Sequence, residues 1–261
     1  MNGVIKISIV ACVFASIILA SCKDNNSSDS STIDKVTARV EYGNEYNDYI
    51  DEVWGVIYYD DWEEEYVAER SKYVNGGFTI DLPSTVSNTY LTDIMDELGW
   101  IQEYPNGSIS DKSAKIGLIW FEAYDDGYYL GDFEYYKYEE NETPSNYSVR
   151  GAYAVFIYTD KNVSLKGSYS ETGDSWREEE TINLNLKKGW NQIFETFEYS
   201  FNENTGNEVS KQSLTTSNPG GLKWYFVDFD DDYDWKTTTK SVEKGVLSEK
   251  FKLSSNKNRK R

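Results

Sequence analysis

Apolar and polar residues alternate with a period of two along much of this chain, a pattern typical of β-strands with one buried and one solvated face. The alternation is cleanest from Ile182 to Leu186. We expect strands over residues 35–42, 53–59, 66–68, 78–82, 117–124, 128–138, 147–159, 163–169, 182–186, 190–201, 208–216 and 222–227, with a loop over 139–146. Turn-forming Gly, Asn, Asp and Pro residues separate these segments. The sequence predicts an all-β fold, an antiparallel β-sandwich, with two smaller β domains as the alternative.

One segment departs from this period and predicts a short amphipathic helix between Ser87 and Gly99. Its apolar residues stand at positions i, i+3, i+4 and i+7, which places them on one helix face. These residues are Leu91, Ile94, Met95 and Leu98. Ser87 or Asn88 can cap the first turn and Gly99 can end the last. We expect this helix to cover an edge or an open end of the sheets.

The N-terminal segment has the features of a bacterial export signal. Asn2 to Lys6 carries one positive charge, and Ile7 to Ala20 is an apolar run too short to span a bilayer as a helix. Leu19-Ala20-Ser21-Cys22 resembles the lipobox of bacterial lipoproteins. The resemblance implies that residues 1–21 are removed and that acyl chains on Cys22 attach the protein to a membrane. An ordinary signal peptide with a chance cysteine is the alternative.

Composition divides the rest of the chain into three parts. Residues 22–32 are small and polar, and we expect a flexible tether there. Residues 33–249 hold the strand signals and form the predicted β-sandwich domain, whereas residues 250–261 are basic and predicted to be disordered. Lys23-Asp24 resembles the export tag of surface lipoproteins in the Bacteroides group, although those tags are more acidic. The expected location is therefore the outer membrane of the cell envelope, with the leaflet and the face left open.

The composition also excludes several kinds of site. The chain contains no histidine, and of its two cysteines Cys12 leaves with the signal while Cys22 carries lipid. Ser-His-Asp and Cys-His nucleophilic sites, His or Cys zinc sites and haem ligation by either residue are therefore excluded. A formal net charge of −19 makes nucleic acid and anionic lipid head groups poor ligands. A solvated surface that keeps an exported protein monomeric also accounts for so many acidic residues.

A C-terminal motif resembles a known group of sequences. It consists of Leu186-Lys187-Lys188-Gly189-Trp190-Asn191, then Thr215-Thr216, then Gly221-Leu222-Lys223-Trp224-Tyr225-Phe226. The motif is similar to the C-terminal half of uncharacterised lipoproteins of the Bacteroides group. The resemblance implies relatedness and a β fold, and it brings no established activity. Trp190 and Trp224 are expected to pack in the core or across strands rather than to act as ligand platforms.

An aspartate-rich segment is a candidate calcium site. Asp228, Asp230, Asp232 and Asp234 place carboxylates at alternate positions, as the start of an EF-hand loop does. The segment then departs from that loop, because Tyr233 stands where glycine is needed and Thr239 where the closing glutamate should be. A plain acidic loop is the alternative, and we expect no other cofactor.

Aromatic residues make up 16% of the chain, which is more than the core of an alternating β domain requires. Exposed rings beside Asp, Asn and Gln suit a neutral sugar, because its axial hydrogens face a ring while its hydroxyls bond carboxylates and amides. The candidates are Trp62 and Trp176, which lie in polar, turn-like sequence, and Trp235, which stands at the end of the aspartate-rich segment. For any one of them, packing under a loop is the alternative.

No pair of carboxylates stands out as catalytic. A glycoside hydrolase needs two carboxylates that flank a cleft, and this chain has 45 Asp and Glu residues without a distinctive spacing. We therefore expect a non-enzymatic, lipid-anchored envelope protein that binds carbohydrate at its surface. The main alternative is a structural or adhesive module that binds another envelope protein, and a carboxylate-based hydrolase is the third hypothesis.

Overall fold

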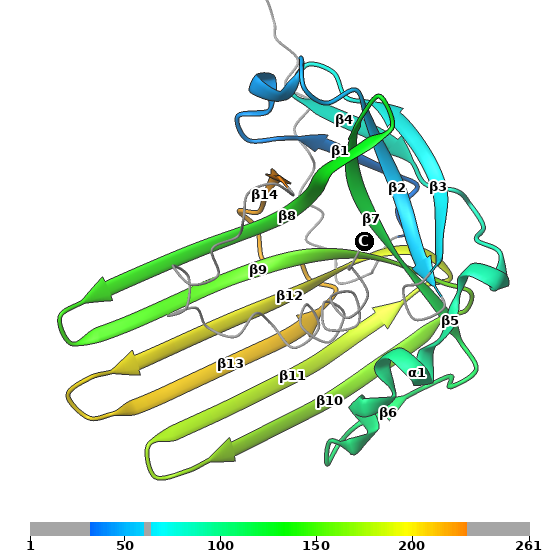
Figure 1. The fold of residues 1–261 in the computed structure, drawn as a ribbon. Coiled ribbons are helices and arrows are strands. Elements are labelled where there is room, and N and C mark those ends of the chain that lie inside the picture. Colours follow the sequence, from blue (N-terminus) through cyan, green and yellow to red (C-terminus); the bar gives the residue numbers. More distant parts are fainter. Residues whose placement is uncertain (1–31, 60–63, 229–261) are drawn as a thin grey trace, which may run out of the picture.

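The computed structural model describes residues 32–59 and 64–228, whose arrangement is drawn in Figure 1. The strands are β1 (Lys35–Arg39), β2 (Glu52–Tyr59), β3 (Glu64–Lys72), β4 (Gly77–Asp81), β5 (Thr92–Asp93), β6 (Ser108–Ile109), β7 (Lys115–Asp125), β8 (Tyr128–Thr143), β9 (Asn146–Thr159), β10 (Val163–Thr172), β11 (Trp176–Leu186), β12 (Gly189–Asn202), β13 (Asn207–Thr215) and β14 (Lys223–Asp228). The helical elements are η1 (Gly43–Tyr46), η2 (Asn88–Tyr90), α1 (Ile94–Leu98) and η3 (Gly99–Glu103). None of these helices has the length and apolar composition to cross a bilayer.

The prediction of an all-β fold is confirmed, and the arrangement is sandwich-like. A large curled sheet follows the order β3-β2-β7-β8-β9-β12-β13-β11-β10-β6, with β14 beside β8 and β5 beside β7. β1 and β4 form a small antiparallel sheet. The large sheet is mixed rather than purely antiparallel, because β13 is inserted between β11 and β12 and therefore runs parallel to β11.

A bend in β8 divides the large sheet into an upper and a lower part (Figure 1). Phe133 of β8 has Phe121 of β7 on one edge and Phe226 of β14 on the other. From Tyr136 onward, β9 replaces β7 as the neighbour on that edge of β8, and Tyr136 pairs with Tyr153. Glycine is required at the bend, because a Cβ atom on Gly131 would lie 2.1 Å from the Val227 carbonyl oxygen. β8 therefore belongs to both parts of the large sheet, the upper part through β7 and the lower part through β9.

The upper core lies between the small sheet, β14 and the curled strands β2, β7 and β8. Its largest side chains are aromatic, and most of them contact one another in edge-to-face, tilted or stacked pairs; they include Tyr73, Phe78, Phe121, Phe133, Phe156 and Trp224. Trp190 belongs to the same core and contacts Tyr158. Trp190 is 2% exposed, and its Nε1 atom donates a 2.8 Å hydrogen bond to the Pro83 carbonyl oxygen. Trp224 is buried as well. The interpretation of both tryptophans as packing residues is confirmed.

The lower core lies on the opposite side of β9 and β12. Alternate residues of β9 show this, since Phe156 belongs to the upper core and Ile157 to the lower one. The lower core is aliphatic and is covered by α1 and η3; its buried members include Ile94, Leu98, Ile101, Leu165, Ile182, Leu184, Leu186, Ile193 and Leu214. The buried side chains of this core are therefore aliphatic, and the half-buried rings of Trp100 and Tyr104 pack against them.

The predicted helix is correct in position but too long. Only Ile94–Leu98 is α-helical, because the backbone of Thr92 and Asp93 pairs with β7 instead of continuing a helix. Ser87 caps the separate element η2 by accepting a hydrogen bond from the Thr89 amide at 3.4 Å. Leu91, Ile94 and Leu98 are buried, as their spacing predicted.

The loop predicted over residues 139–146 is wrong. β8 continues to Thr143 and β9 begins at Asn146, so this polar segment forms the end of a long hairpin. β11 likewise begins at Trp176, six positions before the cleanly alternating run at Ile182. These strands persist because each of their residues pairs with a neighbouring strand on at least one edge. The sequence did not predict these parts of β8 and β11, because their residues are almost all polar.

Candidate functional site

Three long hairpins project side by side from the lower part of the fold (Figure 1). They are β8–β9, β12–β13 and β10–β11. We call their outer portion the hairpin sheet; it comprises residues 136–143, 146–153, 195–202, 207–214, 176–182 and 167–172. Continuous cross-strand registers place its residues in rows that run across the sheet, so the residues of every second row share a face.

One face of the hairpin sheet combines aromatic and acidic side chains. It continues the face on which Ile182 and Leu214 contribute to the lower core. We call it the aromatic–acidic face, and by register it carries Tyr138, Glu140, Glu142, Tyr147, Tyr153, Tyr169, Glu171, Trp176, Glu178, Glu180, Phe197, Tyr199, Phe201, Glu208 and Gln212. Strand alternation brings these residues together from six strands.

The rings on this face contact one another in pairs. Phe197 lies 5.8 Å from Tyr153 and 6.4 Å from Tyr138, measured between ring centroids. Tyr147 and Tyr199 form a further edge-to-face pair at 6.2 Å. Such pairs add stability beyond the area they bury, and half-buried rings leave part of their apolar surface open to a ligand.

Negative charge is concentrated on the same face. Burial raises the pKa of the Tyr199 hydroxyl, and the nearby Glu208 carboxylate raises it further. Burial also raises the pKa of Tyr147, with a smaller contribution from Tyr138 and the Glu140 carboxylate. A tyrosine of ordinary pKa is already neutral at physiological pH, and these shifts keep both hydroxyls as hydrogen-bond donors to more alkaline pH.

The opposite face of the hairpin sheet carries both signs of charge in alternation. The Arg150 guanidinium lies 2.6 Å from Glu139, and the Lys211 ammonium lies 3.6 Å from Glu179. A shallow hollow of about 570 Å³ lies here, and most of its lining residues belong to this face, among them Glu139, Ser148, Arg150, Glu198, Ser200 and Lys211. Because these pairs are exposed, they contribute little to stability, but they cancel much of the charge.

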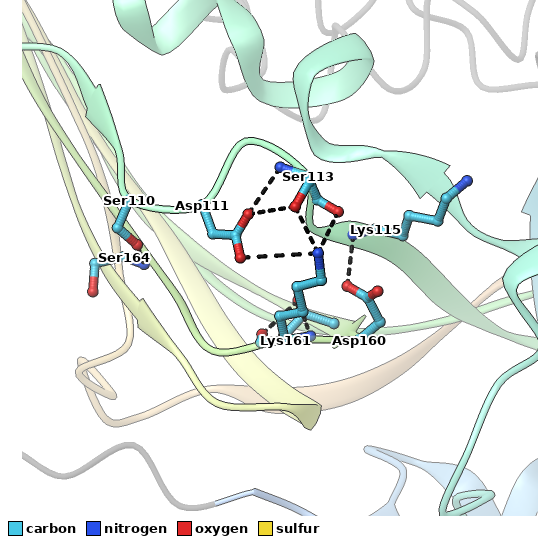
Figure 2. Close-up of polar contacts among 8 residues, drawn as sticks. Ser110, Asp111, Ser113, Lys115, Asp160, Lys161 and Ser164 are labelled. Carbon is cyan, nitrogen blue, oxygen red and sulfur yellow. Dashed lines mark hydrogen bonds and ion pairs between the residues drawn. The ribbon is translucent and has the colours of Figure 1, made fainter.

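A second polar cluster joins the β6–β7 connection to the β9–β10 turn, and Figure 2 shows its contacts. The Lys161 ammonium donates to the Ser113 hydroxyl at 2.6 Å and to the Ser113 carbonyl oxygen at 3.0 Å. The Ser113 hydroxyl and amide both donate to Asp111, at 2.7 and 2.9 Å. A serine next to a lysine suggests a nucleophile and its base, but here the lysine is the donor and the serine proton points to Asp111. These hydrogen bonds therefore hold the β6–β7 connection against the β9–β10 turn.

A buried carboxylate forms the third cluster, on β7. Glu122 is 1% exposed and accepts hydrogen bonds from the hydroxyls of Tyr58 and of Tyr124, the latter at 2.7 Å. Burial and the Glu122 charge raise the pKa of Tyr124. The ring of Trp54 stacks on Tyr124 at 3.8 Å, and the Arg70 guanidinium lies 3.7 Å over Trp54. A carboxylate with two phenol donors is satisfied within the fold.

The structure places few of the residues that the sequence singled out. Cys22, Trp62, Trp235, Asp230, Asp232 and Asp234 lie outside the described residues. Asp228 ends β14 and accepts a 3.4 Å hydrogen bond from the Tyr49 hydroxyl. Within the described ranges, no group of three acidic side chains has an arrangement that could hold a metal ion.

Trp176 is the one described member of the three candidate tryptophans. It is 39% exposed and begins β11, so it belongs to a strand end and not to the expected turn. Its indole packs over Gly173, where a Cβ atom would lie 2.2 Å from Nε1. Register places it on the aromatic–acidic face beside Glu208. It is therefore both a packing residue of the β10–β11 turn and a partly exposed ring.

The tyrosines and phenylalanines of this face were missed, although the sequence contained a signal for some of them. Phe197, Tyr199 and Phe201 alternate with Glu198 and Ser200, which is period two with aromatic residues on one side. The neighbours that complete the face come from other strands, and their register could not be read from the sequence.

No family model matches this chain, and no curated protein or solved structure is significantly similar to it.

Proposed function

We propose that this chain is a lipid-anchored envelope protein whose aromatic–acidic face binds carbohydrate without catalysing a reaction. The supporting observation is the gathering of half-buried rings and carboxylates on one face of the hairpin sheet. Rings stack against the apolar faces of sugars, and carboxylates and the Gln212 amide accept or donate hydrogen bonds to hydroxyls. The lipobox at Cys22 supports attachment to the envelope.

Affinity electrophoresis of the full chain in non-ionic detergent tests this proposal. We expect at least one polysaccharide in a panel of neutral, acidic and amino-sugar polymers to retard the protein. Changing Tyr147, Tyr199 and Phe201 together to Ala should abolish the retardation. Tyr128→Ala is the matched control, since Tyr128 is 75% exposed at the β7–β8 turn, away from this face. Mobility that no polysaccharide changes would contradict the proposal.

A structural or adhesive role is the second candidate, and one observation favours it. β10 pairs with β6 only at Leu165 and Lys166, and no described strand covers its outer edge from Gly167 to Thr172. Such an edge can accept a strand of another protein. Sedimentation of the full chain alone and with envelope extract would reveal assembly, and a monomer in both conditions would count against this role.

A further inference from the structure

Charge is segregated between the two faces of the hairpin sheet. Its four cationic residues, Lys137, Arg150, Arg177 and Lys211, all lie on the face opposite the rings. The two outermost rows of the aromatic–acidic face carry five glutamates and no lysine or arginine; the glutamates are Glu140, Glu142, Glu171, Glu178 and Glu208. A surface built only for solubility would mix both signs on both faces.

The arrangement of these glutamates includes a direct repulsion. Glu171 and Glu178 are cross-strand partners in the β10–β11 hairpin. Like charges that face each other across two strands destabilise the pair. The Tyr169 hydroxyl donates to Glu171 but brings no positive charge. A ligand that supplies positive charge would relieve this repulsion.

The rings lie between two acidic flanks. Tyr147 on β9 and Tyr199 and Phe201 on β12 form the centre. Glu140 and Glu142 on β8 lie on one side, and Glu208 and Glu178 lie on the other side, on β13 and β11. With strands about 4.8 Å apart, the four spacings from β8 to β11 span about 19 Å. This width suits a linear polymer of several units that crosses the strands.

From this charge pattern we infer that the ligand of the aromatic–acidic face is a cationic amino-sugar polymer, whose rings stack on the central aromatics and whose ammonium groups pair with the glutamates on both flanks. The inference rests on the proposed function. An aromatic centre requires flat apolar faces in the ligand, which sugar rings supply and a chain of lysines lacks. Acidic flanks require positive charge, which neutral and acidic polysaccharides lack.

Isothermal titration of the full chain in non-ionic detergent tests the inference with two ligands of equal length. One is the linear hexamer of glucosamine, titrated at a mildly acidic pH at which its amino groups are protonated and glutamate side chains are still ionised. The other is the hexamer of N-acetylglucosamine, which is neutral. We expect the cationic hexamer to bind about tenfold more tightly at low salt, and the difference to shrink as salt screens the charges.

Two triple variants distinguish the effect of the glutamates on the aromatic–acidic face from the effect of the net charge of the protein. Glu140→Gln, Glu178→Gln and Glu208→Gln together should remove the preference for the cationic hexamer. Glu139→Gln, Glu179→Gln and Glu198→Gln together remove the same number of charges from the opposite face of β8, β11 and β12, and should keep the preference. Circular dichroism of both variants should show the wild-type spectrum.

Three other outcomes of these titrations would each contradict a different part of the proposals. If both hexamers bind equally, the proposed carbohydrate binding stands and the charge preference is wrong. If neither hexamer binds and the polysaccharide panel also fails, the proposed function itself is wrong. If polylysine displaces the hexamer and binds as tightly to the Tyr147, Tyr199 and Phe201 variant as to wild type, the face takes basic peptides rather than sugars.

Discussion

At the scale of single residues, the polar contacts in this fold hold connections in place. Asp111 accepts two hydrogen bonds from Ser113, and its second carboxylate oxygen lies 3.9 Å from the Lys161 ammonium. The Ser113 hydroxyl, followed by the Ser113 amide and Lys161, lowers the pKa of Asp111 below its ordinary value of 3.8. The charged form of Asp111 is therefore the form that stabilises the native state.

This pKa predicts a pH-dependent effect of Asp111→Asn. A carboxylate whose pKa is lowered by folding contributes stability above its ordinary pKa, and the contribution disappears as pH falls through the lowered value. Wild type should therefore be more stable than Asp111→Asn at pH 7, and the difference should vanish in strong acid. Urea unfolding from neutral to acid pH measures it, with Asp125→Asn at an exposed strand end as control. A difference that is independent of pH would contradict this origin.

At the scale of elements, the long hairpins depend on close contact between facing side chains. Gly151 on β9 pairs with Phe197 on β12, whose ring covers the glycine. A Cβ atom on Gly151 would lie 2.4 Å from the ring and 2.8 Å from the Lys137 carbonyl oxygen. The ring can move, but the carbonyl oxygen belongs to the neighbouring strand.

Gly151→Ala should therefore destabilise the protein by about 1–3 kcal/mol, the usual cost of overpacking. Phe197→Leu should partly relieve the crowding, so the double variant should lose less stability than the sum of the single variants. Guanidinium unfolding of the three variants gives this comparison. Strictly additive losses would show that the ring and the new methyl group do not compete for space.

At the scale of the whole molecule, the two cores share strands. β12 contributes Trp190 to the upper core and Ile193 to the lower core, and β9 contributes to both cores in the same way. A strand that loses one core loses its support on that face. The two cores should therefore unfold together.

Calorimetry tests this coupling with one variant in each core. Phe78→Ala in the upper core and Leu184→Ala in the lower core should each cost roughly 2–5 kcal/mol. Both variants should lower the midpoint of one common transition, because the described strands join the cores. Two transitions, each lowered by only one of the variants, would support the alternative of two smaller β domains.

The sequence by itself determined the strand-rich class, the position of most strands and the buried face of α1. These features depend on local periodicity, as at Ile182 to Leu186, and on apolar spacing, as at Ile94 and Leu98. The absence of histidine from the sequence also excluded Ser-His-Asp and Cys-His nucleophilic sites.

Only the tertiary structure decided how these elements combine. Local pattern did not reveal the strands from Glu139 to Thr143 and from Trp176 to Thr181, because these polar segments lack the alternation of apolar and polar residues that marks a strand. The same registers set Tyr147 beside Tyr199 and Glu171 opposite Glu178. Alternation tells which residues of one strand share a face, whereas strand order and register, which arise from packing of the whole chain, decide which residues become neighbours.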